Sequence, residues 1–352
     1  MSGWPLAGLA SSKATKSIAA LLIGPACLAN VQVRPASADD FYKGRTISIV
    51  VGYVAGGGYD LAARLLAAHY GRHLEGNPQF IVQNMPGGSS VVAANYLYNV
   101  APKDGTVIGA LGSTIVINKV LGRPAKYETD KFLWIGRLDA GDSVALTWHT
   151  SGVRTIADAK TKSIPVAGGS SMGPAVMGPT ALNKLIGTKF QIVRGYDGSA
   201  SMVAAMEKGE AAGTTTFGLT ALLYTKQHWL KDNLVNVLFL SSSERHPAIP
   251  DVPTMIELAE NDEQRAIFNL LTSEAVIGRN FTAPPGLPAD RAAILRRGFD
   301  SLVADPAFLA DLKSRDIEIS PWSGAKLQEY VRTVTALDDK TVQRAIWATA
   351  SD

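Results

Sequence analysis

The feature that most constrains this chain is a unit of strand, glycine-rich turn and helix that occurs three times in its first third. Each unit begins with a short apolar, largely β-branched run and continues into residues spaced for one buried helix face. The three units are Thr46–Val51 with the turn Gly56–Gly58, Gln79–Gln83 with the turn Pro86–Ser90, and Thr106–Leu111 with the turn Gly112–Thr114. This succession predicts parallel strands with helices on both faces of a sheet.

The same alternation resumes after residue 150. Further strands are expected at Ser163–Ala167, Phe190–Val193, Ala211–Phe217, Val235–Leu240 and Thr272–Ile277. From Pro288 the chain is mainly helical, with Pro306 expected at the first position of a helix. We therefore predict two similar α/β lobes, with the carboxy-terminal helices packing back on the first lobe.

The amino terminus has the pattern of an export signal. Residues 1–38 hold three basic and no acidic residues, and Ser17–Ala29 is mostly apolar. Ala36-Ser37-Ala38 then offers the small residues that signal peptidase accepts. Because a membrane-spanning helix needs about 20 apolar residues, this run is too short to be one. We expect residues 1–38 to be cleaved after export.

Composition excludes several kinds of site. The 352 residues include 1 Cys, which rules out an intramolecular disulfide and a four-Cys zinc site. The 34 Lys and Arg against 31 Asp and Glu argue against a nucleic-acid binder. No Lys-Ser or Lys-Thr follows Gly56–Gly58 as in a phosphate-binding P-loop, and Leu61 stands where a dinucleotide fingerprint needs glycine. We expect no cofactor and no metal.

The three turns of the first lobe point to an anion site. They should meet at the carboxyl ends of parallel strands, where open α/β sheets bind ligands. Each turn opens a helix, so unpaired N–H groups and the positive end of a helix dipole face the same crevice. Ser89, Ser90, Ser113 and Thr114 add hydroxyl donors. Such a surface suits a carboxylate or a phosphate.

A hydrolase is the alternative. Gly169–Gly173 fits the pattern G-x-S-x-G between a strand and a helix, which would make Ser171 a nucleophile. His228 or His246 would then serve as the base. Against this hypothesis, no His-Gly-Gly oxyanion segment precedes the turn.

Several segments together resemble one family, the substrate-binding proteins of tripartite tricarboxylate transporters, also called Bug receptors. The matching segments are Phe41–Val51, Gly56–Asp60, Asn84–Gly88, Ala101–Gly105, Ser113–Asn118, Tyr196–Gly198, Ser241–Thr254 and Ala283–Gly286. They follow the family order over nearly all of residues 41–335, and the stretch ending Pro-Asp-Val-Pro-Thr254 is particularly specific.

The resemblance implies a periplasmic receptor without enzymatic activity. Its fold would be the two-lobed, type II periplasmic-binding-protein fold, each lobe a mainly parallel sheet flanked by helices. Lobe 1 would comprise residues 39–143 and 275–352, and lobe 2 residues 144–274. The ligand, a small organic acid, would lie between the lobes, and the receptor would then dock on the membrane permease subunits. We expect a monomer; whether it feeds a permease or a sensor stays open.

The resemblance also carries over a set of ligand-binding positions. In lobe 1 these are Tyr53, Gly57, Gly58, Tyr59, Asp60, Gly87, Gly88, Ser89 and Ser113. In lobe 2 they are Ser170, Ser171, Met172, Tyr196, Asp197 and Thr216. For Asp60 two interpretations stay open, a helix cap or a direct ligand contact.

The chain departs from the family pattern at several of these positions. Tyr53 stands where Phe is common, and Leu111-Gly112 replace the usual Thr-Ser pair. Asp197 replaces a frequent Lys, which puts a carboxylate where many relatives have a cation. The expected ligand is therefore a small organic acid rather than a plain dicarboxylate.

Overall fold

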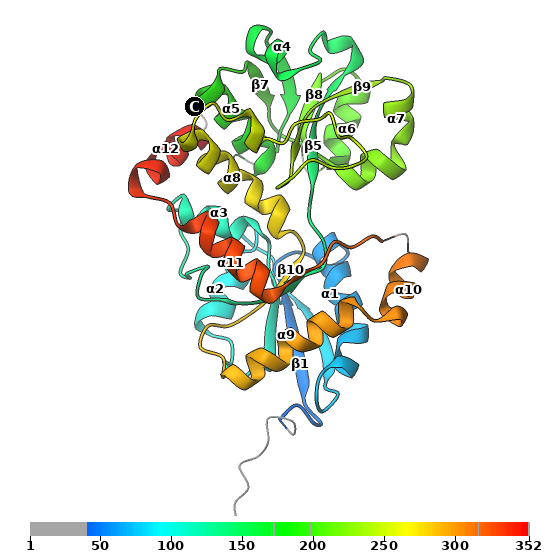
Figure 1. Cartoon of the computed structure of the whole chain (residues 1–352), viewed down its shortest axis with the longest axis vertical. Helices are drawn as coiled ribbons and strands as arrows, with labels where there is room; N and C mark the ends of the chain where they lie inside the picture. Colours follow the sequence, from blue (N-terminus) through cyan, green and yellow to red (C-terminus); the bar gives the residue numbers. More distant parts are fainter. Residues whose placement is uncertain (1–40, 170, 172, 197–198, 316, 351–352) are drawn as a thin grey trace, which may run out of the picture. The chain divides into compact units, whose positions relative to one another are not determined.

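Two mixed sheets, each flanked by helices, make up the part of the chain that the computed structural model describes, namely residues 41–169, 171, 173–196, 199–315 and 317–350 (Figure 1). The first sheet has the strand order β11-β4-β10-β3-β1-β2 and the second β7-β6-β8-β5-β9. The strands of the first sheet are β1 (Thr46–Val51), β2 (Gln79–Asn84), β3 (Val107–Ala110), β4 (Leu133–Arg137), β10 (Asn280–Ala283) and β11 (Trp322–Ser323). Those of the second are β5 (Ser143–Trp148), β6 (Ile164–Ala167), β7 (Phe190–Val193), β8 (Gly213–Gly218) and β9 (Val235–Ser241).

Parallel pairing brings the three turns of the first sheet to one edge. β1 pairs in parallel with β2 on one side and with β3 on the other. All three strands therefore end at the same edge, and the turns that follow them open α1 (Gly58–His69), α2 (Val91–Asn99) and α3 (Thr114–Val120). The prediction that these turns meet is confirmed for this sheet.

Both sheets are mixed, but most strands of each run in one direction, as predicted. In the first sheet β10 runs antiparallel to both β3 and β4, and β11 runs antiparallel to β4. In the second sheet β6 pairs in parallel with β7 and β8, whereas β5 pairs antiparallel with β8 and β9. The strands that run against the others are β5, where the chain enters the second sheet, and β10 and β11, which follow its return to the first.

One predicted strand is wrong. Thr272–Ile277 is the last part of helix α8 (Asp262–Ile277), which Asn261 caps by accepting the Gln264 N–H at 2.9 Å. Because the end of this helix is buried on most sides, its sequence is apolar without a clear period. The prediction also missed β4, β5, β10 and β11, whereas β1 and β7 have the predicted bounds. The lobe boundaries near residues 143 and 274 stay predictions.

The remaining helices cover the two sheets. They are α4 (Ile156–Thr161), α5 (Pro174–Ile186), α6 (Ser199–Glu207), α7 (Gln227–Lys231), α9 (Ala289–Val303), α10 (Pro306–Ser314), α11 (Gly324–Thr335) and α12 (Asp339–Thr349), with the short turns η2 (Tyr70–His73), η3 (His149–Ser151), η4 (Ala221–Thr225) and η5 (Ile256–Leu258). Pro306 begins α10 as predicted. α9 and α11 pack on β4 of the first sheet, but α12 packs on α5 and α8. Within the described ranges, none of the helices has the length and hydropathy that crossing a membrane requires.

Candidate functional site

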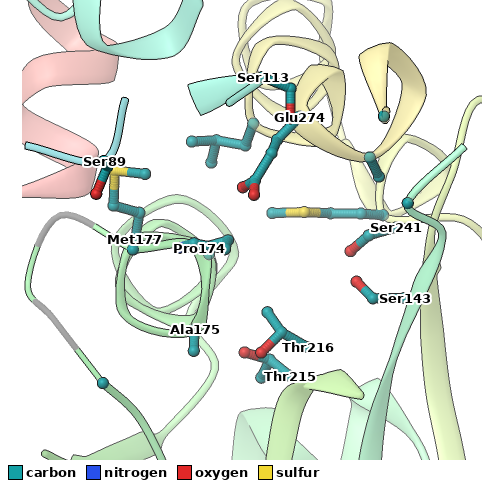
Figure 2. Close-up of a pocket in the computed structure, with 18 of the residues that line it drawn as sticks. Ser89, Ser113, Ser143, Pro174, Ala175, Met177, Thr215, Thr216, Ser241 and Glu274 are labelled. Atoms are coloured by element: carbon teal, nitrogen blue, oxygen red, sulfur yellow. The ribbon is translucent and has the colours of Figure 1, made fainter. Parts of the chain in front are cut away.

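A cavity of about 780 Å³ receives side chains from both sheets and from α8 (Figure 2). Its volume lies within the range of about 300–1,000 Å³ that is typical of small-molecule sites. The polar side chains that line it are mostly hydroxyls: Tyr53, Tyr59, Ser89, Ser113, Ser143, Tyr196, Thr215, Thr216 and Ser241. Met177, Met202, Phe239, Met255 and Leu271 supply apolar surface.

Tyr59 organises the first-sheet side of the cavity. Its ring stacks on that of Tyr53, with centroids 4.9 Å apart. Its hydroxyl accepts the Ser113 N–H at 3.2 Å, lies 3.2 Å from Ser113 Oγ and donates to the Gly278 carbonyl at 3.2 Å. Burial raises the pKa of Tyr53 and of Tyr59 above the usual phenol value, so both hydroxyls stay protonated donors.

Ser90 does not line the cavity but links the turn after β2 to the turn after β3 by a hydrogen bond. It is fully buried, and its Oγ accepts the Gly112 N–H at 2.9 Å. A Cβ on Gly52 would lie 1.7 Å from the same Oγ, so the end of β1 needs glycine there. The N–H groups of Gly112 and Ser113 thus donate to side chains of the protein itself. The polar surface of the cavity is therefore formed mainly by hydroxyl groups, and less by the main-chain N–H groups that the sequence predicted.

Asp60 belongs to the scaffold of the first turn. It lies in the first turn of α1, while the N-cap is Gly57. Its carboxylate accepts from Arg64 Nε at 2.9 Å, from the Gly56 N–H at 2.9 Å and from Asn84 Nδ2 at 2.9 Å. The Arg64 side chain and the Gly56 N–H hold the pKa of Asp60 well below its usual range. The side chain is 4% exposed and does not line the cavity. The interpretation of Asp60 as the helix cap is wrong, because Gly57 takes that position, and a ligand contact stays a prediction.

The second sheet contributes hydroxyls and the start of a helix. Thr215 and Thr216 project from β8, Ser143 from β5 and Ser241 from β9. Gly173, Pro174 and Ala175, at the amino-terminal end of α5, line the same cavity. No described side chain caps this end of α5. Its dipole therefore directs partial positive charge toward the cavity.

The end of α8 brings the charged residues. Glu274 lines the cavity, and its Oε2 is buried without a hydrogen-bond partner among the described residues. Burial raises the pKa of Glu274 from its usual 4.5 to about 7. Arg279, also in the lining, forms an ion pair with Asp139. Sequence reasoning missed both residues, because neither belongs to a recognisable motif.

The structure brings together six of the residues predicted to bind ligand: Tyr53, Tyr59, Ser89, Ser113, Tyr196 and Thr216. Gly57, Gly87 and Gly88 do not line the cavity, and Gly58 lies instead against the Arg279 guanidinium. Ser171 is exposed and is not among the lining residues. Ser170, Met172 and Asp197 lie outside the described residues. The part that any of these residues takes in binding stays a prediction.

The features proposed for a hydrolase do not come together. His228 is exposed on α7, and His246 is engaged locally through its Nδ1, which accepts the Ala248 N–H at 3.2 Å. No described hydrogen bond joins either histidine to Ser171. Within the described ranges, His, Cys, Asp and Glu side chains form no group of three suited to a metal ion.

Comparison with known proteins identifies relatives along most of the chain. It is 25% identical over 297 residues to a UPF0065 protein of Bordetella bronchiseptica, an alignment that covers 82% of this chain and 81% of the relative. It is 23% identical over 302 residues to the UPF0065 protein in the tcbD-tcbE intergenic region of Pseudomonas sp., an alignment that covers 84% and 85% of the two chains. No family model matches the chain.

Solved structures share its fold. A TctC solute-binding protein from Polaromonas superposes with a TM-score of 0.66 at 19% identity, over 86% of this chain and 98% of that one. Rpa4515 of R. palustris with adipate gives 0.59 at 22% identity, over 86% and 97%. MatC of Rhodopseudomonas palustris with bound malate gives 0.55 at 18% identity, over 87% and 99%. The fold is thus that of type II periplasmic binding proteins. In sequence the chain is similar to UPF0065 proteins over most of its length, and it has the fold of the solute-binding proteins TctC and BugD.

Proposed function

We propose that this protein captures a small organic acid in the periplasm, between its two sheets, and delivers it to the permease of a tripartite tricarboxylate-type transporter. The observation that carries the proposal is a cavity that is lined both by turns of the first sheet and by β5, β8, β9 and α5 of the second. A ligand that contacts both sheets stabilises the conformation in which residues of both sheets are close enough to bind it.

The chemistry of the lining supports a carboxylate ligand. Ser89, Ser113, Thr215 and Thr216 offer hydroxyl donors, and α5 directs the positive end of its dipole toward the cavity. A hydrogen bond to a charged group contributes about 1.5–3 kcal/mol, and a micromolar affinity requires about −8 kcal/mol. Three or four such bonds reach this affinity. Adipate in Rpa4515 and malate in MatC show that proteins of this fold hold carboxylates.

The test of capture is calorimetric titration of the chain from Asp39 onward with a panel of organic acids. Ser113→Ala removes a lining hydroxyl and should weaken binding about tenfold. The matched control is Ser163→Ala, since Ser163 is exposed, lies immediately before β6 and does not line the cavity; this variant should bind as the wild type does. Equal affinities in all three proteins would remove Ser113 from the site.

Export is tested separately. Residues 1–38 lie outside the described residues, and the proposal rests on their sequence pattern. Amino-terminal sequencing of the protein recovered from a periplasmic extract should begin at Asp39. Recovery of an intact Met1 only in the cytoplasmic fraction would contradict export.

A further inference from the structure

The carboxylate of Glu274 stands in the cavity without a partner. Figure 2 shows it pointing into the open space, on the side of Ser113. Oε2 has no hydrogen-bond partner among the described residues, although the cavity is rich in hydroxyls. An ionised carboxyl group in such a place is unfavourable unless a donor or a cation completes it.

The described lining does not supply that cation. Arg279 is the basic side chain in the lining, and its guanidinium is engaged by Asp139. The titratable groups near Glu274 are the phenols of Tyr53 and Tyr59, which carry no positive charge. Tyr59 already donates its hydroxyl proton to the carbonyl of Gly278, the residue that follows α8. A positive group would therefore have to arrive with the ligand.

Two helix ends give the cavity opposite electrostatic poles. Glu274 lies in the last turn of the 16-residue helix α8, where the helix dipole is negative. The 13-residue helix α5 presents its positive amino-terminal end to the same cavity at Gly173 and Ala175. A negative pole at α8 suits a cation, and a positive pole at α5 suits an anion.

A second observation, independent of the α5 dipole, also places an anion-binding group on this side of the cavity: the hydroxyl of Thr215. This side chain is 3% exposed, and its Oγ1 has no hydrogen-bond partner among the described residues. Figure 2 shows Thr215 and Thr216 on the opposite side of the cavity from Glu274. The cavity therefore has an unsatisfied acceptor on one side and an unsatisfied hydroxyl on the other.

We propose that the cavity takes an organic acid that also carries a protonated amino group, and that Glu274 is the residue that selects for this group. The inference rests on the proposed capture of carboxylates. The ammonium group donates to Glu274 at the α8 pole, while the carboxylate accepts from Thr215 at the α5 pole. A second carboxylate in place of the ammonium would meet Glu274 as a like charge.

The test compares ligand pairs of equal length that differ by the amino group: aspartate and succinate, glutamate and glutarate, 6-aminohexanoate and adipate. Calorimetry at about pH 8 keeps Glu274 ionised in the free protein. The wild type should prefer the amino member of the best-binding pair at least tenfold. Glu274→Gln should weaken that member about 100-fold, as expected when one partner of a buried charged pair is lost, and remove the preference.

Glu210→Gln is the control, an exposed residue after α6 that does not line the cavity, and it should bind as the wild type does. Circular dichroism and thermal unfolding without ligand establish that each variant is folded. Tighter binding of the diacid by the wild type, or unchanged binding of the amino compound by Glu274→Gln, would overturn the role of Glu274 and leave carboxylate capture standing. If no acid of any pair or of the wider panel binds, carboxylate capture itself is wrong.

Discussion

The hydroxyl of Tyr53 occupies the space that a side chain on residue 112 would need. A Cβ built on Gly112 would lie 2.4 Å from Tyr53 Oη, closer than any real contact of this kind. The family resemblance leads one to expect Phe at the first position and Ser at the second. These two departures are therefore one exchange, in which a phenol hydroxyl replaces a serine side chain at the cavity wall.

This exchange predicts a coupled pair of substitutions. Gly112→Ser should destabilise the protein by about 1–3 kcal/mol, because the new side chain forces the Tyr53 ring aside. Tyr53→Phe should lower the free energy of unfolding by less than Gly112→Ser does. The double substitution should restore most of the stability that Gly112→Ser removes. Urea denaturation of the four proteins gives the coupling energy. Strictly additive effects would show that the two residues do not compete for this space.

Two adjacent serines should respond in opposite ways to alanine. Ser90→Ala leaves the buried Gly112 N–H without its acceptor and should lower the free energy of unfolding by about 1–3 kcal/mol. Ser89 is exposed and lines the cavity, so Ser89→Ala should lower ligand affinity with little effect on unfolding. Denaturation and calorimetry on both variants check this. A stability loss for Ser89→Ala equal to that of Ser90→Ala would contradict it.

The ionised Asp60 side chain should stabilise the fold at pH values above the usual pKa of Asp and should no longer do so in acid. Because its pKa is lower in the folded chain than in the unfolded chain, its contribution is complete above about pH 4 and is lost as the pH falls further. Asp60→Asn should lower the free energy of unfolding by about 1–3 kcal/mol at neutral pH. The difference in this free energy between the variant and the wild type should become smaller in acid. Urea denaturation over a pH series measures this.

Asp130→Asn, at an exposed position, is the control and should leave the pH profile unchanged. Calorimetry on Asp60→Asn should show unchanged ligand affinity, because the carboxylate does not line the cavity. A selective loss of affinity without a loss of stability would restore the interpretation of Asp60 as a ligand contact.

Glu274 should have the opposite pH dependence. Its pKa is higher in the folded chain, at about 7 against the usual 4.5, so ligand-free protein loses stability as the pH rises through this interval. Glu274→Gln should be more stable than the wild type at pH 8, by at most about 3 kcal/mol, and no more stable near pH 4. The phenols of Tyr53 and Tyr59, whose pKa values burial raises, stay neutral throughout. Equal stability of the two proteins at pH 8 would show that Glu274 is not desolvated.

Much of the first sheet could be predicted from the sequence, because its parallel strands carry local signals. β1 is a β-branched run followed at once by glycines, and Ser113 follows β3 in the same way. Parallel pairing then requires that the turns share one edge. Tyr53, Tyr59, Ser89 and Ser113 reach one cavity for this reason.

The elements that link the sheets could not be predicted in the same way. β4 leads into β5 with no helix between them, and β10 pairs with strands more than 140 residues earlier in the chain. The sequence did hold one usable signal for α8: Asn261 before two acidic residues is a helix start, and from it the helix continues through Thr272. Glu274 was missed along with that helix.

The position of β10 has a consequence for how the protein is made. It is an inner strand of the first sheet, between β3 and β4, yet it comes from residues that follow every strand of the second sheet. Until residue 283 has been synthesised, β3 and β4 have open edges where their common neighbour belongs, and such edges invite aggregation. A nascent chain thus cannot complete its first sheet until it has also made every strand of the second.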